Sequence, residues 1–196
     1  QRIIIQKILN QAKVLKLSDK AIMGEYLENL SKNVNSGDTS NKEAIAAKGY
    51  FVSLFGDKFS REYEDIYNIA LNYGYAILRG AIARAIVSYG YIPSVGIHHK
   101  SELNNYNLAD DFIEPFRPIV DLWVKTNIDE KTEFNKYIRA ELVNLLNVDV
   151  KIQGKKQSVT NAINIMIGSY TTAINQNDYK KIQLPEIIPL QVHKYE

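Results

Sequence analysis

The longest uninterrupted pattern in this chain is a run of helix-forming, mostly apolar residues from about Arg61 to Tyr89. Within it, the segment IALNYGYAILRGAIARAIVSY carries apolar side chains around most of a helical circumference. A helix that is apolar on nearly every side is stable only when other elements cover it. The pattern therefore predicts a long, buried central helix around which the rest of the chain must pack.

Shorter segments on both sides of this helix repeat apolar residues every three or four positions, which is the spacing of one helical face. Stretches rich in Gly, Pro, Asn or Ser separate them and mark their ends. Further helices are predicted over residues 3–16, 19–32, 40–55, 108–124, 133–146 and 158–175. Pro115 and Pro118 each remove a backbone donor, so we expect the helix at 108–124 to be bent or divided.

The C-terminal part of the chain carries the only sign of β-structure. DVKIQGKKQ alternates weakly around a glycine, which predicts a small surface β-hairpin near 148–157. The proline-interrupted tail at about 177–196 is expected to be extended, and either packs on its own domain or adds to a partner subunit. The fold class is therefore mainly α, in one helical domain over 1–196, which suits a chain with 45% apolar residues.

Composition excludes several classes of protein. No apolar run approaches the roughly 20 residues of a membrane span, so no membrane association is expected. The chain contains no Cys, which excludes disulfides and thiol nucleophiles and fits the cytoplasm. A net charge of +2 is too small to indicate nucleic-acid binding by itself. Because the chain opens at Gln1 directly in a helical pattern, we expect that an N-terminal portion is missing.

Three separated stretches carry side chains suited to a divalent cation. These are Glu43 in SNKEAIAAKGYF, His99 in VGIHHKSELNNYNLADD and Glu114 in DDFIEPFRPIVD. His99 is predicted to lie in a loop, and Asp111 shares a helical face with Glu114 because three residues separate them. Mixed carboxylate and imidazole ligands suit Mg²⁺ or Mn²⁺ better than Ca²⁺.

Each of these residues also has a purely structural interpretation, which local sequence leaves open. Ser40 and Glu43 have the spacing of a capping box at the start of a helix. Charged residues from Asp110 through Glu114 to Asp121 recur at helical spacing, as in a salt-bridged stripe that faces solvent. Adjacent histidines in a loop are more often surface residues than ligands.

A resemblance adds to this local reading. The string GIHHKSELNNYNLADDFIEPFRP, the glutamate in NKEAIAAKGYF and the helix LNYGYAILRGAIARAI together resemble the C-terminal catalytic domain of the CRISPR-associated integrase of spacer acquisition, and the type II branch is the most similar. The resemblance covers nearly the whole chain. It implies that Glu43, His99 and Glu114 bind the catalytic metal and that Asp111 matches a further acid of the family, with His98 beside the site. It also implies a helical catalytic lobe from which the family's N-terminal β-rich domain is absent.

The activity implied by the resemblance is that of a divalent-metal-dependent DNA endonuclease and integrase. Such an enzyme inserts new spacer DNA into a CRISPR array by attack of a 3′-hydroxyl on a repeat phosphodiester. Two carboxylates without their ion would repel that phosphate, so DNA docking is expected to need the metal. Whether the lobe alone is active does not follow from the resemblance.

The implied partners are the incoming spacer DNA, the CRISPR repeat, a second copy of the full-length protein, a small CRISPR-associated adaptation subunit and other type II adaptation proteins. Four basic residues near the motifs are candidate phosphate contacts, although arginines on a buried helix usually pair with internal acids. They are Arg79, Arg84, Lys100 and Arg117. The alternative is a noncatalytic helical DNA-binding or scaffold module, in which Glu43, His99 and Glu114 only cap helices and pair with neighbours.

Overall fold

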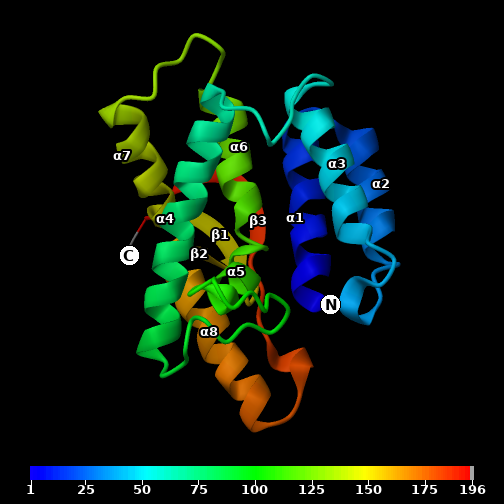
Figure 1. The fold of residues 1–196 in the computed structure, drawn as a ribbon, viewed down its shortest axis with the longest axis vertical. Coiled ribbons are helices and arrows are strands. Elements are labelled where there is room, and N and C mark those ends of the chain that lie inside the picture. Colours follow the sequence, from blue (N-terminus) through cyan, green and yellow to red (C-terminus); the bar gives the residue numbers. More distant parts are fainter. Residues whose placement is uncertain (195–196) are drawn as a thin grey trace.

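The computed structural model describes residues 1–194, and helices dominate this part of the chain (Figure 1). The α-helices are α1 (Arg2–Leu17), α2 (Ala21–Ser31), α3 (Lys42–Phe55), α4 (Ile66–Ser88), α5 (Asn107–Ile113), α6 (Arg117–Asn127), α7 (Lys136–Asn144) and α8 (Val159–Asn175). The strands are β1 (Val148–Ile152), β2 (Lys155–Ser158) and β3 (Glu186–Val192). The mainly α class expected from the sequence is confirmed, and no helix of the described part is long and apolar enough to cross a membrane.

Helix α1 lies at the boundary between two groups of helices. In Figure 1, α1, α2 and α3 stand together on one side, and α4 to α8 with the small sheet form the other. Helix α1 contacts α2 and α3 within its own group and contacts α6 and β3 across the boundary. Its apolar residues Ile8, Ala12 and Leu15 are fully buried. A polar side chain on the face of α1 that points toward this boundary can therefore contact residues of both groups.

Helix α4 is the long helix predicted from the sequence, but it begins at Ile66 rather than near Arg61. The side chain of Asp65 caps it by accepting a hydrogen bond from a backbone N–H in the first turn. At Gly74 the helix approaches α6 so closely that a Cβ atom would collide with Val120. The expectation that α4 is buried on nearly all sides is wrong, because several of its side chains are exposed. These are Ile69, Arg79, Arg84 and Val87.

The expected division of the helix at 108–124 is confirmed, since α5 and α6 are separate helices and Pro118 lies in the first turn of α6. Asn10 of α1 stabilises the junction between them. Its buried amide group donates to the carbonyl oxygens of Pro115, at 2.7 Å, and Pro185, at 2.9 Å. Its Oδ1 atom accepts from the backbone N–H of Ile187 at 3.2 Å. One side chain thus joins α1 to the α5–α6 junction and to β3.

The predicted hairpin near 148–157 is confirmed as β1 and β2, which are antiparallel. Gln153 and Gly154 connect them with positive φ angles of 52° and 77°, as a tight two-residue hairpin turn requires. The tail packs on its own domain: β3 pairs antiparallel with β1 and gives the strand order β2-β1-β3. Its pairing as a strand was not predicted, and residues 195–196 of the expected tail lie outside the described part.

A buried polar cluster joins α3, α4 and α6. The carboxylate of Asp121 on α6 accepts hydrogen bonds from the hydroxyl groups of Tyr50 on α3, at 2.9 Å, and Tyr75 on α4. Burial raises the pKa of Asp121 to about 6, although the two phenol hydrogen bonds act in the opposite direction. Burial likewise raises the pKa of both tyrosines well above 10. The cluster is therefore an ionisable crosslink between the two helix groups.

The raised pKa of Asp121 predicts how stability depends on pH. Because the folded-state pKa of about 6 exceeds the ordinary aspartate value of 3.8, ionisation of Asp121 opposes folding as pH rises from about 4 to about 6. Asp121→Asn cannot ionise, so we expect this variant to gain on the order of 2 kcal/mol of unfolding free energy relative to the unaltered chain across that interval. Urea unfolding at several pH values measures the gain. Asp57→Asn, at an exposed position, should show none, and a pH-independent difference for Asp121→Asn would contradict the interpretation.

Candidate active site

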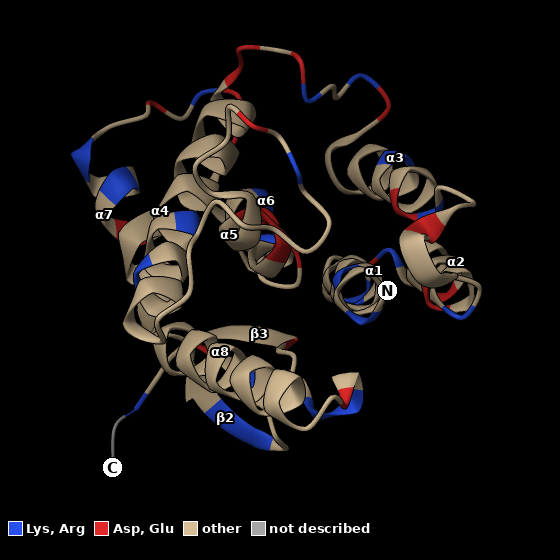
Figure 2. Ribbon diagram, turned by 60° about the horizontal axis from the view of Figure 1, so that its bottom comes forward, with Lys and Arg blue, Asp and Glu red and all other residues tan. Residues whose placement is uncertain are grey.

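Lys7 of α1 lies between two carboxylates at the boundary of the helix groups. Its Nζ atom is 2.6 Å from Oε1 of Glu43 on α3 and 2.5 Å from Oε2 of Glu114, which follows α5. The side chains of Lys7 and Glu114 are only 12% and 7% exposed. Figure 2 shows this arrangement as basic positions on α1 between acidic positions on α3 and at the α5–α6 junction. The structure thus brings two of the three expected metal ligands to one cation.

The carboxylate of Glu43 is free to reach Lys7 because another residue caps α3. Both oxygens of Asp38 accept hydrogen bonds from the start of this helix, one from the backbone N–H of Lys42 at 2.9 Å and one from that of Glu43 at 2.8 Å. The prediction that Ser40 and Glu43 form a capping box is therefore wrong. Each of residues 38–41, just before this helix, carries a side-chain acceptor, and the turn that precedes α3 places that of Asp38 on the open amides.

Glu114 is buried at the junction between α5 and α6, with a cation at each of its oxygens. Nε of Arg117 donates to Oε1 at 3.0 Å, and Oε2 lies beside Lys7 without a directed hydrogen bond. Burial would raise the pKa of Glu114, but Lys7 and Arg117 outweigh it and lower this pKa below 4.5. Burial would lower the pKa of Lys7, but the nearby carboxylates of Glu114 and Glu43 outweigh burial and raise this pKa. The prediction of a salt-bridged stripe that faces solvent from Asp110 to Asp121 is wrong, because both Glu114 and Asp121 are buried.

Asp111 organises the loop that carries the histidines. Its carboxylate accepts hydrogen bonds from the backbone N–H groups of Ile97 at 2.5 Å, His98 at 3.0 Å and His99 at 3.2 Å. Its Oδ1 atom also lies 2.7 Å from Nδ1 of His99. Because an ionised carboxylate only accepts, Nδ1 carries a proton, and in the neutral imidazole Nε2 then keeps a free lone pair. A carboxylate behind the imidazole is the usual arrangement for orienting a histidine toward a metal.

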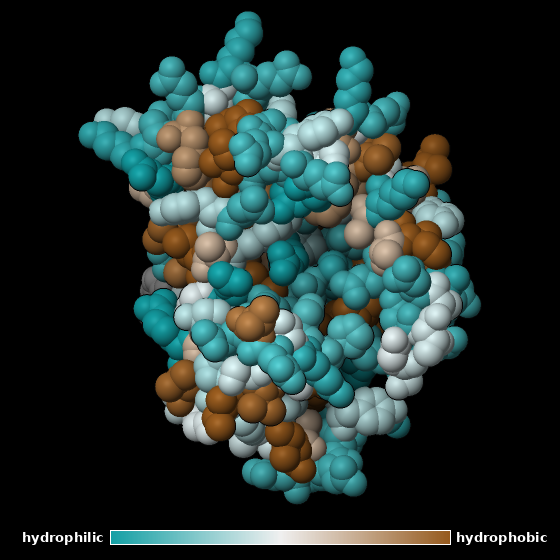
Figure 3. All heavy atoms as spheres, viewed as in Figure 1, coloured by the Kyte–Doolittle hydropathy of each residue, from teal (hydrophilic) through white to brown (hydrophobic). Residues whose placement is uncertain are grey.

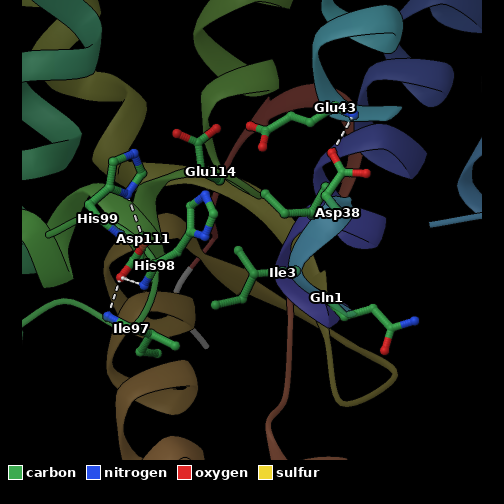
Figure 4. A pocket seen from close by; sticks show the side chains of 11 residues that line it. Gln1, Ile3, Asp38, Glu43, Ile97, His98, His99, Asp111 and Glu114 are labelled. Atoms are coloured by element: carbon green, nitrogen blue, oxygen red, sulfur yellow. Dashed lines mark hydrogen bonds and ion pairs between the residues drawn. The ribbon is translucent and has the colours of Figure 1, made fainter. Parts of the chain in front are cut away.

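The expected ligands line one cavity of about 80 Å³, to which Glu43, His99, Asp111 and Glu114 all contribute. Figure 4 shows the carboxylates of Glu43 and Glu114 pointing toward each other from opposite sides, with the two imidazoles of His98 and His99 on the side of Glu114. Figure 3 shows that hydrophilic side chains gather in the middle of the face between the two helix groups. The three motifs that are far apart in the sequence therefore meet in space.

The donor atoms suit a divalent cation. Oxygens of Glu43 and Glu114 approach a single point, now taken by Nζ of Lys7, and the buried Oε2 of Glu114 has no directed hydrogen bond. Two carboxylates and an imidazole form a mixed oxygen and nitrogen set of the kind that binds Mg²⁺ or Mn²⁺. Within residues 1–194, however, no three His, Asp or Glu side chains are arranged to hold one ion together. The residues share a cavity, and full coordination requires them to approach further.

A second hollow, of about 210 Å³, has three arginines in its lining, one of which contacts Glu114. Arg117 contributes to it while it binds Glu114, and Arg79 of α4 and Arg61 before α4 complete the basic lining. The other two candidates, Arg84 and Lys100, are exposed and lie outside this hollow. Arg61 was not recognised from the sequence, because it precedes a helix and no pattern there indicates that it turns back toward α4.

Comparison with known proteins identifies the family. The model of the family described as CRISPR associated protein Cas1 matches residues 1–159. The chain belongs to the Cas1 family. A CRISPR-associated endonuclease Cas1 from Neisseria meningitidis serogroup C (strain 8013) is 43% identical over 199 residues, which cover 100% of this chain and 66% of the relative. The chain thus spans just under two thirds of the length of the curated relatives that it matches along its whole length.

Solved structures share the fold. A chain in a partial Cas6-RT-Cas1–Cas2 complex superposes with a TM-score of 0.75 and 18% identity, over 95% of this chain and 67% of that one. A casposase bound to an integration product superposes with a TM-score of 0.67 and 23% identity, over 91% of this chain and 65% of that one. At these identities, the likeness establishes that the chain has the Cas1 fold.

Lys7 is a second site residue, besides Arg61, that the sequence analysis missed. Two polar residues at helical spacing from it on α1, Asn10 and Gln11, are buried. Polar side chains among the apolar residues that predict the buried face of this helix were the available signal, because buried polar groups must find partners. The sequence could not name those partners, which lie on other helices.

The contacts of Asp111 predict a local effect of its removal. Asp111→Ala deletes the acceptor of three backbone amides, so we expect the amides of residues 97–99 to lose protection from hydrogen exchange and the unfolding free energy to fall by about 1–3 kcal/mol. Hydrogen exchange followed by mass spectrometry measures the first effect. Asp110→Ala is the matched control, because the Asp110 carboxylate accepts instead from the Asn104 side chain. Equal deprotection in both variants would contradict the proposed role of Asp111.

Proposed function

We propose that this chain is the helical catalytic lobe of a divalent-metal-dependent DNA endonuclease and integrase that inserts new spacer DNA into a CRISPR array. The observation that carries this proposal is the meeting of Glu43, His99 and Glu114 at one cavity, with both carboxylates directed at one cation position. Membership of the Cas1 family supports the reaction class, since the relatives are named CRISPR-associated endonucleases. The casposase with a similar fold is bound to an integration product.

The proposed reaction exchanges one phosphodiester for another, so it needs no nucleotide cofactor. Glu43, His99 and Glu114 would hold a Mg²⁺ or Mn²⁺ ion, which would supply positive charge where negative charge develops on the attacked phosphodiester. The protein contributes the orientation of these ligands. Asp111 holds the histidine loop and leaves Nε2 of His99 free, and Arg117 holds the carboxylate of Glu114 in place.

The charge of the site differs from what the carboxylates alone predict. Lys7 and Arg117 together offset the two negative charges of Glu43 and Glu114. The repulsion of a phosphate by the metal-free site is therefore weaker than expected from the sequence. Metal is still required for the chemistry, but the electrostatic penalty on docking DNA without it is small.

The arginine-lined hollow is the proposed path of the DNA backbone beside the reacting phosphodiester. Arg61, Arg79 and Arg117 face it, with Asp110 as the acidic group of its lining. Arg79 is 3.9 Å from Asp110 and its side chain is 44% exposed, so this ion pair is loose enough to exchange for a phosphate. Arginine and phosphate contacts of this kind position DNA without reading its sequence.

The proposed partners follow from the family. We infer that the full-length protein works as a homodimer with a small CRISPR-associated adaptation subunit, on spacer and repeat DNA in the cytoplasm. The structural neighbours that come from Cas1–Cas2 complexes support the adaptation subunit as a partner class.

One observation favours the noncatalytic scaffold. Lys7 already satisfies Glu43 and Glu114, as it would if these residues only joined helices. The imidazole of His99, whose Nε2 this arrangement leaves free of Asp111, and the shared cavity favour catalysis instead.

Substitution of the ligands separates the two functions. We expect Glu43→Gln, His99→Ala and Glu114→Gln each to lower Mn²⁺-dependent cleavage and strand transfer on branched DNA at least about a hundredfold, because each removes a ligand of the ion that stabilises the transition state. Gel analysis of end-labelled DNA measures the products. Glu28→Gln, which breaks a similar glutamate–lysine pair away from the cavity, should keep full activity. Equal activity in all four variants and the unaltered chain would support the scaffold.

The arginine hollow predicts a salt-dependent effect. Arg79→Gln should weaken binding to duplex DNA of any sequence and reduce the slope of log K against log salt concentration by about 1, since one phosphate contact is lost. Fluorescence anisotropy at several salt concentrations measures both quantities. Arg139→Gln removes an exposed arginine from α7 and should change neither. An unchanged slope for Arg79→Gln would place the DNA elsewhere.

A further inference from the structure

The contacts of Lys7 differ from those of an ordinary surface lysine. Lys16, on the same helix, pairs with Glu28 at 2.6 Å, and both side chains are more than one third exposed. Lys7 instead contacts two carboxylates that come from different elements, and its own side chain is only 12% exposed. Its Nζ atom thus lies where Glu43 and Glu114 converge.

We propose that Lys7 is the resident cation of the metal-free site, and that a divalent ion must displace its ammonium group in order to bind. This inference rests on the proposed function, because it assumes that Glu43 and Glu114 are ligands. Lys7 holds the two carboxylates together before the ion arrives, and it competes with the ion for the same oxygens. It is a positioning residue of the site and touches no substrate in this role.

Distances support exchange at one position rather than addition beside it. The Nζ atom is 2.5 to 2.6 Å from the two oxygens, whereas Mg²⁺ binds oxygen at about 2.0–2.1 Å. The carboxylates therefore need to move by only about half an ångström to close on a metal ion. Two cations of this kind cannot share the position, because their charges repel strongly at such separations.

The two cations at Glu114 are not equivalent. Arg117 contacts Oε1 and Lys7 contacts Oε2, so an ion that replaces Lys7 leaves the Arg117 contact intact. Lysine also ends a flexible chain of four methylene groups, and it can withdraw its ammonium group toward solvent while its stem stays packed. The exchange therefore needs a rotamer change in Lys7 and leaves the backbone of α1 in place.

Metal binding to variants of the 196-residue chain tests this inference. We expect Lys7→Met to bind Mn²⁺ roughly ten- to hundredfold tighter than the unaltered chain in isothermal titration calorimetry, because the competing cation is gone. Without metal, Lys7→Met should melt at a lower temperature, and Mn²⁺ should raise its melting temperature more than that of the unaltered chain. Lys7→Arg, which keeps a cation beside the carboxylates, should bind Mn²⁺ no tighter than the unaltered chain.

The controls locate the effect. Lys16→Met breaks the exposed pair on the same helix and should leave Mn²⁺ affinity unchanged. Adding Glu114→Gln to Lys7→Met should abolish the gain, because the variant then lacks a proposed ligand. If Lys7→Met unfolds without metal, restoration of a cooperative melting transition by Mn²⁺ supports the inference, and failure to restore it overturns the inference.

The outcomes separate this inference from the proposed function. Binding of Mn²⁺ by the unaltered chain with equal or weaker binding by Lys7→Met would show that Lys7 does not compete, and would leave the metal site standing. Binding by neither chain would overturn the metal site itself and this inference with it.

Discussion

Two carboxylates that approach each other in a mostly buried place must be balanced by positive charge, and this requirement organises the centre of the molecule. An unpaired ionised carboxylate at the depth of Glu114 would cost several kcal/mol. Lys7 and Arg117 supply the balance from two directions, one across the helix boundary and one from the next turn of the chain. Helices α1, α3 and the α5–α6 junction are consequently held in register by charge as well as by apolar packing, and the cavity forms where they meet.

The helices and the hairpin could be predicted because their signals are local. Apolar spacing gave the positions of the helices, Pro115 and Pro118 gave the division between α5 and α6, and the glycine in DVKIQGKKQ gave the turn of the hairpin. The strand β3 was missed because its pairing depends on β1, about forty residues earlier in the chain, and no local pattern encodes that partner. Helices α3 and α4 begin later than predicted for a related reason. The conformation of the turn before a helix decides which side chain reaches its first backbone amides.

The candidate site was predicted in part. Its three expected ligands came from motifs that resemble a family, and the structure places them at one cavity. Lys7 and Arg61 were not foreseen, because their importance arises only when α1 and the segment before α4 are packed beside distant residues. The sequence did not define the role of Asp111. In the structure its carboxylate accepts hydrogen bonds from the backbone of the histidine loop and contacts the imidazole of His99, so it holds this loop in place.

Asn10 has a consequence for how the protein is made. It lies three residues from Lys7 on α1 and bonds to Pro185 and Ile187, in a segment that follows the part of the chain matched by the family model. Proteins are synthesised from the N-terminus, so α1 leaves the ribosome long before its partner strand exists. Until then the buried amide of Asn10 lacks those partners, and α1 cannot settle in its final place. The cavity that Glu43, His99 and Glu114 line is therefore completed late in synthesis, only after Pro185 and Ile187 have left the ribosome.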